Sequence, residues 1–581
     1  MPIAYEDICT TAALRAINNQ EMTTHRCYIA TLCALLCALL PAASHAQQNE
    51  RADFELGCAT EILANIMREF EQGYVDKVSA DKLLQAAADG LVHATDPYSE
   101  YISEESMSEF EIMTTGKYGG VGSLIRKRGE HVLFAQPYKG APADEVGIKV
   151  GDKIVAIDGK SATSLDIAEV SARLKGEPGT EVEVVIERNI DAAIDTLHIT
   201  RRRISIPSVP YSGMLRDGVG YICHNDFIDG SYDELRRSLE QLMATDSLRG
   251  LVLDYRSNGG GVMQEAVKIA SLFVPRGELI VSLMGRDSSS LREFRTEQLP
   301  LAADIPIVVL VNGASASASE ILAGALQDLD RAVVMGQRTF GKGLVQATRA
   351  VGYNSYLKYT MSRYYIPSGR CIQALNYAAR RSDGSVERVA DSLLTEYRTR
   401  GGRRVYDGGG ILPDCKAEPQ YVSRFALTLY AMGYLEDWAD EYMRRHRDES
   451  IDVRSFSISD EDYESFKSFI ADRDVPYESE TRRALTQLKE AARNDLYDER
   501  LDDVIAELEA MIKDDKMSNL ETYRNEIIDA INADIIMRHA YNSGAVEHAA
   551  VNDKLVNMAV ELLLDEEEYR RILREQDLDK E

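Results

Sequence analysis

Two junctions of this 581-residue chain combine residue types that support nucleophilic catalysis. In the first, an apolar run ends at Tyr255 and a glycine-rich bend follows at residues 258–261. In the second, an apolar run ends at Asn312, and the small residues ASASASE lead into a helix expected from about Ser317. Small residues let a backbone approach a substrate closely, and amides at a helix N-terminus favour negative charge. A nucleophile at the second junction would therefore have an oxyanion site beside it.

The residue types alone leave the nucleophile open, because Ser315, Ser317 and Ser319 suit the role equally. A serine nucleophile needs a base to take its proton. The nine histidines are scattered without metal-ligand spacing, so no metal and no other cofactor is predicted. Lys342 stands between two glycines with apolar neighbours, which suits an amine whose pKa is lowered by burial. His224, in YICHNDF, is a weaker alternative base.

Residues 336–342 also fit the phosphate-loop pattern G-x-x-x-x-G-K. The next residue of that pattern should be Ser or Thr to hold magnesium, but here it is Gly343. The following residues, LVQATRAV, predict a strand where the pattern requires a helix. ATP or GTP binding is therefore not expected.

The elements that must position these residues change along the chain, which predicts an α/β multidomain fold. Residues 52–113 have helical spacing and predict a helical N-terminal region. Residues 114–205 predict a small β-rich module, with one helix from Ser164 to Lys175 and a groove of peptide width. Strands and helices alternate over residues 206–420, which predicts an α/β layered core. Residues 421–581 predict an acidic, helix-rich C-terminal region, either an interaction module or a cover for the core.

Composition narrows the classes of partner. The chain has 95 acidic and 66 basic residues and a formal net charge of -29, so no nucleic-acid partner is expected. Four of the eight cysteines lie beyond the N-terminal segment, and Cys371 could pair with Cys415. A chain of this length does not need a disulfide framework.

Residues 1–46 are predicted to be a secretory signal peptide. The apolar run YIATLCALLCALL is too short to span a membrane, and the small residues before Ala46 suit cleavage after it. We expect translation to start at Met22, because the residues before it are acidic and unlike the start of a signal peptide. The expected location is periplasmic or secreted, and an uncleaved signal anchor is the alternative.

Part of the β-rich module resembles a PDZ domain. The resemblance rests on APADEVGIKVGDKIVAIDG at residues 141–159, and YGGVG at residues 118–122 resembles the carboxylate-binding loop of that domain. A glycine-rich backbone exposes amides that can hold a terminal carboxylate, while an adjacent strand edge pairs with the peptide. The expected peptide-binding residues are Gly119, Gly120, Val121 and Gly122.

From about residue 55 to 420 the chain resembles the carboxyl-terminal processing peptidases, also called tail-specific proteases. The resemblance rests on LDYRSNGGG, NGASASASEI, GQRTFGKGLVQ and GGILPD, with DPYSEYIS in the N-terminal region. It implies a crotonase-like peptidase core. It also implies Ser317 as the nucleophile, Lys342 as the base and Gln346 as the residue that holds the lysine.

With Ser317 as the nucleophile, the amide of Ala318 and one from Gly260 or Gly261 would form the oxyanion hole. Lys342 and Gln346 are four residues apart, so in a strand they would share one face. The chain departs from the family pattern at Gly259, where proline is usual, which leaves open which glycine amide faces the oxyanion.

These observations together predict a secreted serine endopeptidase that engages protein carboxyl termini through its PDZ domain and cleaves the chain with a Ser-Lys dyad. A noncatalytic PDZ scaffold on a degenerate peptidase fold is the competing hypothesis. The expected partners are protein or peptide substrates, without nucleic acid or metal, and a second copy of the chain bound through the C-terminal helices.

Overall fold

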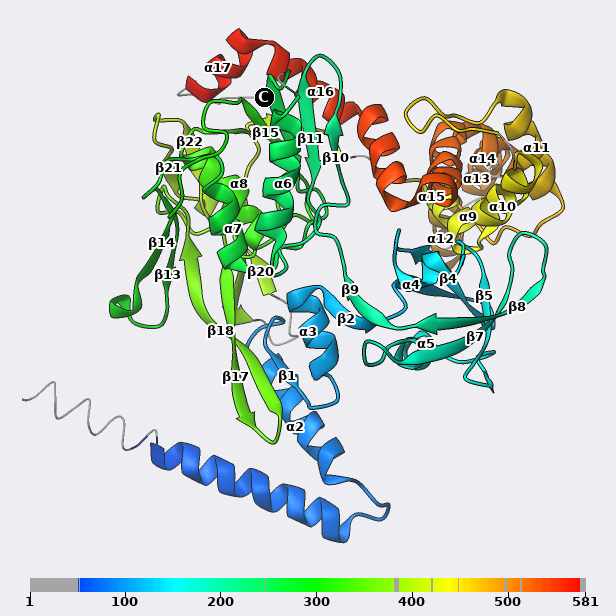
Figure 1. Cartoon of the computed structure of the whole chain (residues 1–581). Coiled ribbons are helices and arrows are strands. Elements are labelled where there is room, and N and C mark those ends of the chain that lie inside the picture. The colour runs from blue at the N-terminus through cyan, green and yellow to red at the C-terminus, as the bar shows by residue number, and fades with distance from the viewer. Residues whose placement is uncertain are drawn as a thin grey trace, which may run out of the picture. The chain divides into compact units, whose positions relative to one another are not determined.

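The computed structural model describes residues 51, 53–245, 247–380, 386–419, 422–447, 449–495, 499–512 and 515–574 (Figure 1). The expected signal peptide and the start at Met22 lie outside these residues. The chain divides into two compact units, one up to Ala94 and one from Thr95. In the first unit residues 53–73 are helical, and α2 spans Ala80–His93. No helix in the described segments is long and apolar enough to cross a membrane.

A six-stranded sheet lies at the centre of the second unit, in the order β10-β11-β12-β15-β16-β23. Its first two strands are antiparallel and the remaining pairs are parallel. The runs GLVLD and IVVLV of β12 and β15 are buried throughout, as expected for parallel strands covered on both faces. The strands are β10 Tyr211–Met214, β11 Val219–Cys223, β12 Gly250–Asp254, β15 Ile307–Val311, β16 Val333–Gly336 and β23 Cys415–Lys416.

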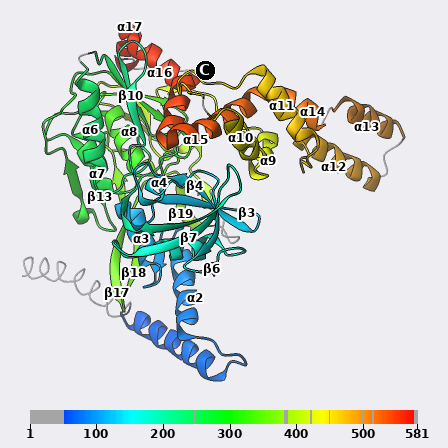
Figure 2. The same ribbon diagram turned by 45° about the vertical axis from the view of Figure 1, so that its right-hand side comes forward.

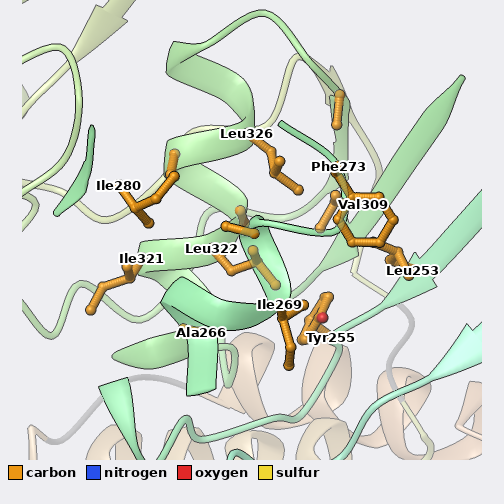
Figure 3. Close-up of a cluster of buried hydrophobic side chains, with 14 of the residues drawn as sticks. Leu253, Tyr255, Ala266, Ile269, Phe273, Ile280, Val309, Ile321, Leu322 and Leu326 are labelled. Carbon is orange, nitrogen blue, oxygen red and sulfur yellow. The ribbon is translucent and has the colours of Figure 1, made fainter. Parts of the chain in front are cut away.

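Helices cover both faces of this sheet (Figure 1). On one face, α6, α7 and α8 supply the side chains of the largest apolar cluster, part of which is drawn in Figure 3. On the other face, α16 and α17 from the end of the chain pack against β11, β12, β15 and β16. The helices are α6 Ser231–Met243, α7 Met263–Ala270, α8 Ala318–Asp328, α16 Lys554–Leu564 and α17 Glu566–Arg574.

A second sheet has the order β1-β18-β13-β14, with β17 paired to β18 as a long hairpin. The N-terminal region is therefore helical apart from β1, which pairs with β18 far along the chain. The segment after this hairpin forms two small pairs, β19 with β20 and β21 with β22. The elements are β1 Glu100–Ile102, α3 Met107–Thr115, β13 Leu279–Met284, β14 Arg292–Arg295, β17 Leu344–Gly352, β18 Ser355–Tyr365, β19 Leu375–Arg380, β20 Val386–Arg388, β21 Glu396–Arg398 and β22 Arg404–Tyr406.

The expected β-rich module forms a sheet in the order β3-β4-β5-β7-β8, so β3 is an edge strand. Its helix α5 is shorter than predicted and begins after Asp166, whose side chain caps the Glu169 amide. The elements are β2 Lys117–Gly120, β3 Ser123–Arg128, β4 His131–Pro137, α4 Pro142–Glu145, β5 Lys153–Ile157, β6 Lys160–Ser161, α5 Ile167–Leu174, β7 Glu181–Glu187, β8 Ile194–Thr200 and β9 Arg202–Ser205.

The C-terminal region is helical, as predicted, and has its own apolar cluster around the buried Trp438. It contacts the β-rich module through the ion pairs Arg126–Glu436 and Arg128–Asp437. The helices are α9 Arg424–Ala431, α10 Tyr434–Arg445, α11 Asp460–Ala471, α12 Glu480–Asn494, α13 Glu499–Met511, α14 Lys516–Thr522 and α15 Arg524–Asn552.

Tyr569 of α17 joins the end of the chain to the central sheet. Its hydroxyl accepts a hydrogen bond from the Ile307 amide and donates one to the Ile307 carbonyl, both at 2.9 Å. Both residues are buried, so these backbone groups have no access to water as a substitute partner. The sequence left two roles open for the C-terminal region, an interaction module or a cover for the core. Helices α16 and α17 act as a cover for the core.

We predict that Tyr569→Phe destabilises the core around the central sheet by about 1–3 kcal/mol, the cost of leaving buried hydrogen-bonding groups unpaired. The shift of the denaturation midpoint, followed by circular dichroism, measures this loss. Tyr353→Phe is the matched control, because Tyr353 is 99% exposed. Equal midpoints for the two variants would contradict a structural role for the Tyr569 hydroxyl.

Candidate active site

Ser317 lies immediately before α8, at the carboxyl end of β15, and its backbone is strained. Its φ of 57° and ψ of -114° are unusual for a residue with a side chain. Such strain persists only where the surrounding structure imposes it, and it is concentrated at functional sites. The side chain is half-buried, so it reaches solvent at the end of the sheet.

The two neighbouring serines have structural partners instead. Ser315 is buried, and its hydroxyl donates to the Tyr255 carbonyl at 2.8 Å. Ser319 is also buried, and its hydroxyl donates to the Asn258 carbonyl at 3.0 Å. Both bonds join the second junction to the first. The geometry therefore favours Ser317 among the three serines that the residue types left open.

Glu320, three residues after Ser317, is fully buried and accepts four hydrogen bonds. Its Oε2 accepts from the amides of Ser317 at 2.8 Å and Lys342 at 2.9 Å. Its Oε1 accepts from the Gly341 amide at 2.8 Å and the Thr339 hydroxyl at 2.5 Å. Burial raises the pKa of the carboxyl to about 7, although the four donors oppose the rise. One carboxylate thus holds the backbones of Ser317 and Lys342 together.

Lys342 lies in the loop between β16 and β17, and its Nζ is 4.5 Å from the centre of the Tyr98 ring. Burial lowers the pKa of this amine below its usual range, and the charge of Lys358 lowers it further, while Glu320 and Asp96 act in the opposite direction. Within the described residues, Lys342 Nζ makes no hydrogen bond to Ser317 Oγ. Catalytic hydrogen bonds are often long or absent before substrate binds.

Steric constraints require a glycine at position 341, immediately before Lys342. Gly341 has a φ of 88°, and a Cβ there would lie 2.4 Å from the Cβ of Ala374. A residue with a side chain would be strained at this φ, and Ala374 already fills the space that its Cβ would need. Only glycine therefore fits position 341. The loop that carries Lys342 is therefore pressed against the rest of the core.

The sequence led us to expect that Gln346 and Lys342 share one face of a strand. The structure does not place them on a common face. β17 begins at Leu344, so Lys342 precedes the strand, and the register shifts between Val345 and Gln346. The Gln346 side chain donates to the Thr360 hydroxyl at 3.0 Å. The alternation of side chains along a strand therefore does not relate the two residues.

Of the residues expected to form the oxyanion hole, Gly260 and Ala318 lie beside Ser317, while Gly261 lies against Phe227. A Cβ on Gly260 would lie 2.8 Å from both the Ala318 amide nitrogen and the Ser317 Cβ. The Gly260 amide is already used, since it donates to Asn258 Oδ1 at 2.9 Å. In the described structure the amides of Gly261 and Ala318 have no hydrogen-bond partner, so they are the donors open to an oxyanion.

The loop expected to bind a peptide carboxylate lies at the start of the β-rich module. Gly119 and Gly120 are in β2, where they pair with Arg203 and Arg202 of β9. Val121 and Gly122 follow and are buried, and they lead into the edge strand β3. Gly119 and Gly120 are thus part of a separate two-stranded pair, and Val121 and Gly122 connect that pair to the open edge at β3.

The alternative groups have other roles. His224 is fully buried between the rings of Phe227 and Tyr255, and burial lowers the pKa of its imidazole to about 3. It does not suit a base at neutral pH. Asp328 forms a buried ion pair with Arg370 at 2.8 Å. The described residues include no cluster of ligands for a metal ion, and Cys371 and Cys415 are unpaired.

Sequence reasoning missed three residues of the site. Glu320 stands in the run ASASASE, but nothing near it in sequence indicates that it bonds residues 339–342. Tyr98 belongs to DPYSEYIS, but nothing near it in sequence places it on Lys342. Asn258 is fully buried, and its side chain donates to the His224 carbonyl at 2.7 Å while fixing the Gly260 amide.

Fold and site together define a class of protein. Residues 218–377 match the family model of peptidase family S41, residues 133–188 match the PDZ domain, and residues 425–563 match the model "Probable PDZ-protease, C-terminal helical domain". The resemblance and the fold class drawn from the sequence are confirmed. Along the chain, a segment similar to the PDZ domain is thus followed by one similar to the core of peptidase family S41 and by one similar to the helical domain of PDZ proteases.

Among the curated proteins that are similar to this chain are two described as "Probable CtpA-like serine protease". That of Staphylococcus aureus (strain bovine RF122 / ET3-1) is 36% identical over 312 residues, 53% of this chain and 62% of the relative. That of Staphylococcus haemolyticus (strain JCSC1435) is 35% identical over 300 residues, 52% of this chain and 60% of the relative. The chain thus covers less than two thirds of these relatives. A solved structure of the photosystem II D1 C-terminal processing protease is 27% identical and covers 62% of this chain and 93% of its own, with a TM-score of 0.33.

We predict that Glu320→Gln lowers kcat about 10- to 100-fold, the scale of one or two lost hydrogen bonds to a charged group. The new NH2 group cannot accept from the amides of Ser317 or Lys342. KM should change little, because Glu320 is buried below the site. Steady-state kinetics on an unfolded protein measures both constants. The exposed Glu297→Gln is the control, and an unchanged kcat in folded Glu320→Gln would refute the role.

Proposed function

We propose that the chain is a secreted serine endopeptidase that uses a Ser-Lys dyad and binds protein carboxyl termini through its PDZ domain. The observation that carries the proposal is the Glu320 carboxylate, which joins the backbone of the strained Ser317 to that of Lys342. A noncatalytic scaffold would not need a strained serine at a helix start.

The proposed reaction begins with neutral Lys342, which takes the proton of Ser317 Oγ as the oxygen attacks the scissile carbonyl. The amides of Gly261 and Ala318 stabilise the oxyanion, and each such donor is typically worth about 3 kcal/mol. The protonated lysine then gives its proton to the leaving amine. An acyl-enzyme on Ser317 remains, and water activated by Lys342 hydrolyses it. In this scheme the lysine side chain turns from the Tyr98 ring toward Ser317, and Gln346 orients it there.

The proposed peptide site uses the free edge of β3. A peptide would add to this edge as a strand, with its terminal carboxylate at the amides of the loop from Gly119 to Gly122. The wall opposite is α5, whose Ile167 is 43% exposed, and β3 offers Leu124, which is 50% exposed. An apolar last residue suits these side chains.

We also propose self-association through the C-terminal helices α12 and α13 (Figure 2). In the described region this pair buries only a small apolar cluster, and α13 leaves Val504, Leu508 and Met511 exposed at helical spacing. α12 has four basic and two acidic residues, whereas α13 has five acidic residues and one basic residue. Two copies of the pair would therefore complement each other in a four-helix arrangement. Sedimentation of the full chain, with and without Val504→Glu, tests this contact.

We predict that Ser317→Ala and Lys342→Ala each abolish cleavage of an unfolded protein, because nucleophile and base act as one unit. Gln346→Ala should reduce turnover less. Gel electrophoresis of the digest measures the loss, and circular dichroism confirms folding. Ser289→Ala, in an exposed loop, is the control. Full activity in Ser317→Ala would show that the nucleophile lies elsewhere.

We predict that kcat/KM rises with pH and reaches its plateau below the ordinary lysine pKa of about 10.4. The base must be neutral, and burial lowers the pKa of Lys342, so the neutral form becomes dominant at a lower pH than in water. Rates on one peptide across a pH series measure the midpoint. A rise that only begins above the ordinary lysine pKa would contradict a buried base.

We predict that a substrate with an amidated or aspartate-ending terminus is cut about tenfold more slowly than one with an apolar free terminus. Amidation removes the carboxylate, and aspartate places charge in the apolar pocket, each at the cost of about one charge-assisted interaction. The cleavage rates of one unfolded protein, prepared with four different last residues, test this preference. Indifference to the terminus would remove the tail-recognition proposal and leave the Ser317 chemistry untouched.

A further inference from the structure

The loop that carries the Gly261 amide contains three glycines in succession, at residues 259–261. Glycine adopts many backbone conformations, so this run has no strong orientation of its own. A half-turn of the peptide group between Gly260 and Gly261 would put a carbonyl oxygen where an oxyanion needs an N–H donor. A contact from outside the run must therefore hold this peptide group.

Phe227, in the segment between β11 and α6, makes such a contact through its backbone. Its amide donates to the Gly260 carbonyl at 3.1 Å, and its carbonyl accepts from the Val262 amide at 2.6 Å. The two bonds form an isolated parallel bridge between Phe227 and Gly261. A trans peptide group is planar, and its carbonyl and N–H point in opposite directions. The bond to the Gly260 carbonyl thus turns the Gly261 N–H away from Phe227.

The glycine run lies between Phe227 and Ser317. A Cβ on Gly261 would lie 2.3 Å from the Phe227 carbonyl oxygen, whereas a Cβ on Gly260 would lie 2.8 Å from the Ser317 Cβ. An N–H that points away from Phe227 is therefore on the side of the nucleophile. The bridge holds the Gly261 amide in the orientation that an oxyanion requires.

The ring of Phe227 anchors the backbone that forms the bridge. The ring is fully buried and stacks on Tyr255, with centres 5.6 Å apart and planes 13° apart. The ring of His224 meets it edge to face at 4.6 Å. His224 directly follows β11, and Tyr255 directly follows β12 at the start of the glycine-rich loop. The Phe227 ring therefore joins the loops that follow two adjacent strands.

Burial alone would give Phe227 a role in stability and none in the reaction. Phe273 provides the comparison, because it is fully buried in the same apolar cluster and is drawn in Figure 3. It follows α7, and its carbonyl accepts from the Arg331 side chain at 2.8 Å. Of these two phenylalanines, Phe227 is the one bonded to the glycine run.

We infer that Phe227 is a positioning residue for the reaction, because its bridge and its stacked ring hold the Gly261 N–H toward the oxyanion formed on attack by Ser317. The inference rests on the proposed peptidase function. A side chain without an aromatic ring would loosen the anchor and let the peptide group turn. The oxyanion would then lose a donor, while the binding of substrate would change little.

The test compares the methyl ester of an N-acetylated amino acid with its thionoester, in which sulfur replaces the carbonyl oxygen. Sulfur is a weak hydrogen-bond acceptor, so a site with oriented amides prefers the ester. Loss of one oxyanion donor typically lowers kcat about 100- to 1,000-fold, and a donor that is only loosened costs less. We expect Phe227→Leu to lower kcat for the ester about tenfold with little change in KM. The ester-to-thionoester ratio of kcat/KM should fall by a similar factor.

Phe273→Leu is the matched control, because it makes the same change in the same cluster. It should lower the thermal midpoint and keep both kcat and the ratio. An unchanged ratio in folded Phe227→Leu, or an equal fall in Phe273→Leu, would overturn the inference. Phe227→Met is closer in volume and is measured in the same way if Phe227→Leu does not fold.

The two proposals fail in different ways. Absence of hydrolysis that depends on Ser317, for the ester and for an unfolded protein, would refute the peptidase function. Hydrolysis that depends on Ser317 but shows no preference for the ester in the unaltered protein would refute only the positioning role of Phe227. An unchanged ratio in the folded Phe227 variants would do the same.

Discussion

A single buried carboxylate, that of Glu320, organises the candidate active site. An ionised group removed from water is costly unless hydrogen bonds replace its hydration, and here donors from Ser317, just before α8, and from residues 339–342 do so. These segments must be formed together, because each supplies part of the compensation. Thr339 extends the network by accepting from the Ile411 amide at 2.7 Å. The relative position of the Ser317 and Lys342 backbones is therefore set in the interior.

The central sheet brings both junctions to this carboxylate. β12 and β15 are parallel neighbours, so their carboxyl ends meet at one edge. Asn312 accepts from the Ser257 amide at 2.9 Å, and Asn258 accepts from the Ala316 amide at 3.0 Å, so each loop is bonded to the other. The helices α16 and α17 complete the second face of the same sheet. The geometry of the candidate site thus depends on the central sheet and on helices that lie far along the chain.

The sequence predicted the parts of this arrangement that are local. The apolar runs of β12 and β15, the helix after Ser317 and the strand after Lys342 follow from periodicity and small-residue turns. The use of the Gly260 amide and the loop position of Lys342 could not be predicted, since they depend on a side-chain bond and on where β17 begins. Tyr98 reaches Lys342 only through a sheet built from distant segments. Long-range contacts of this kind leave no periodic signal.

The attachment of α17 to β15 has a consequence for the lifetime of the protein. Under the proposed function, a protein that cleaves other chains from their carboxyl termini would be exposed to digestion by other copies of itself. Its last described helix is held by the two hydrogen bonds of Tyr569 and by buried apolar side chains, so no extended segment is available there in the native state. Attack within α17 would require this helix to leave the central sheet first. Resistance to self-digestion is thereby tied to the same folding equilibrium that maintains the active site.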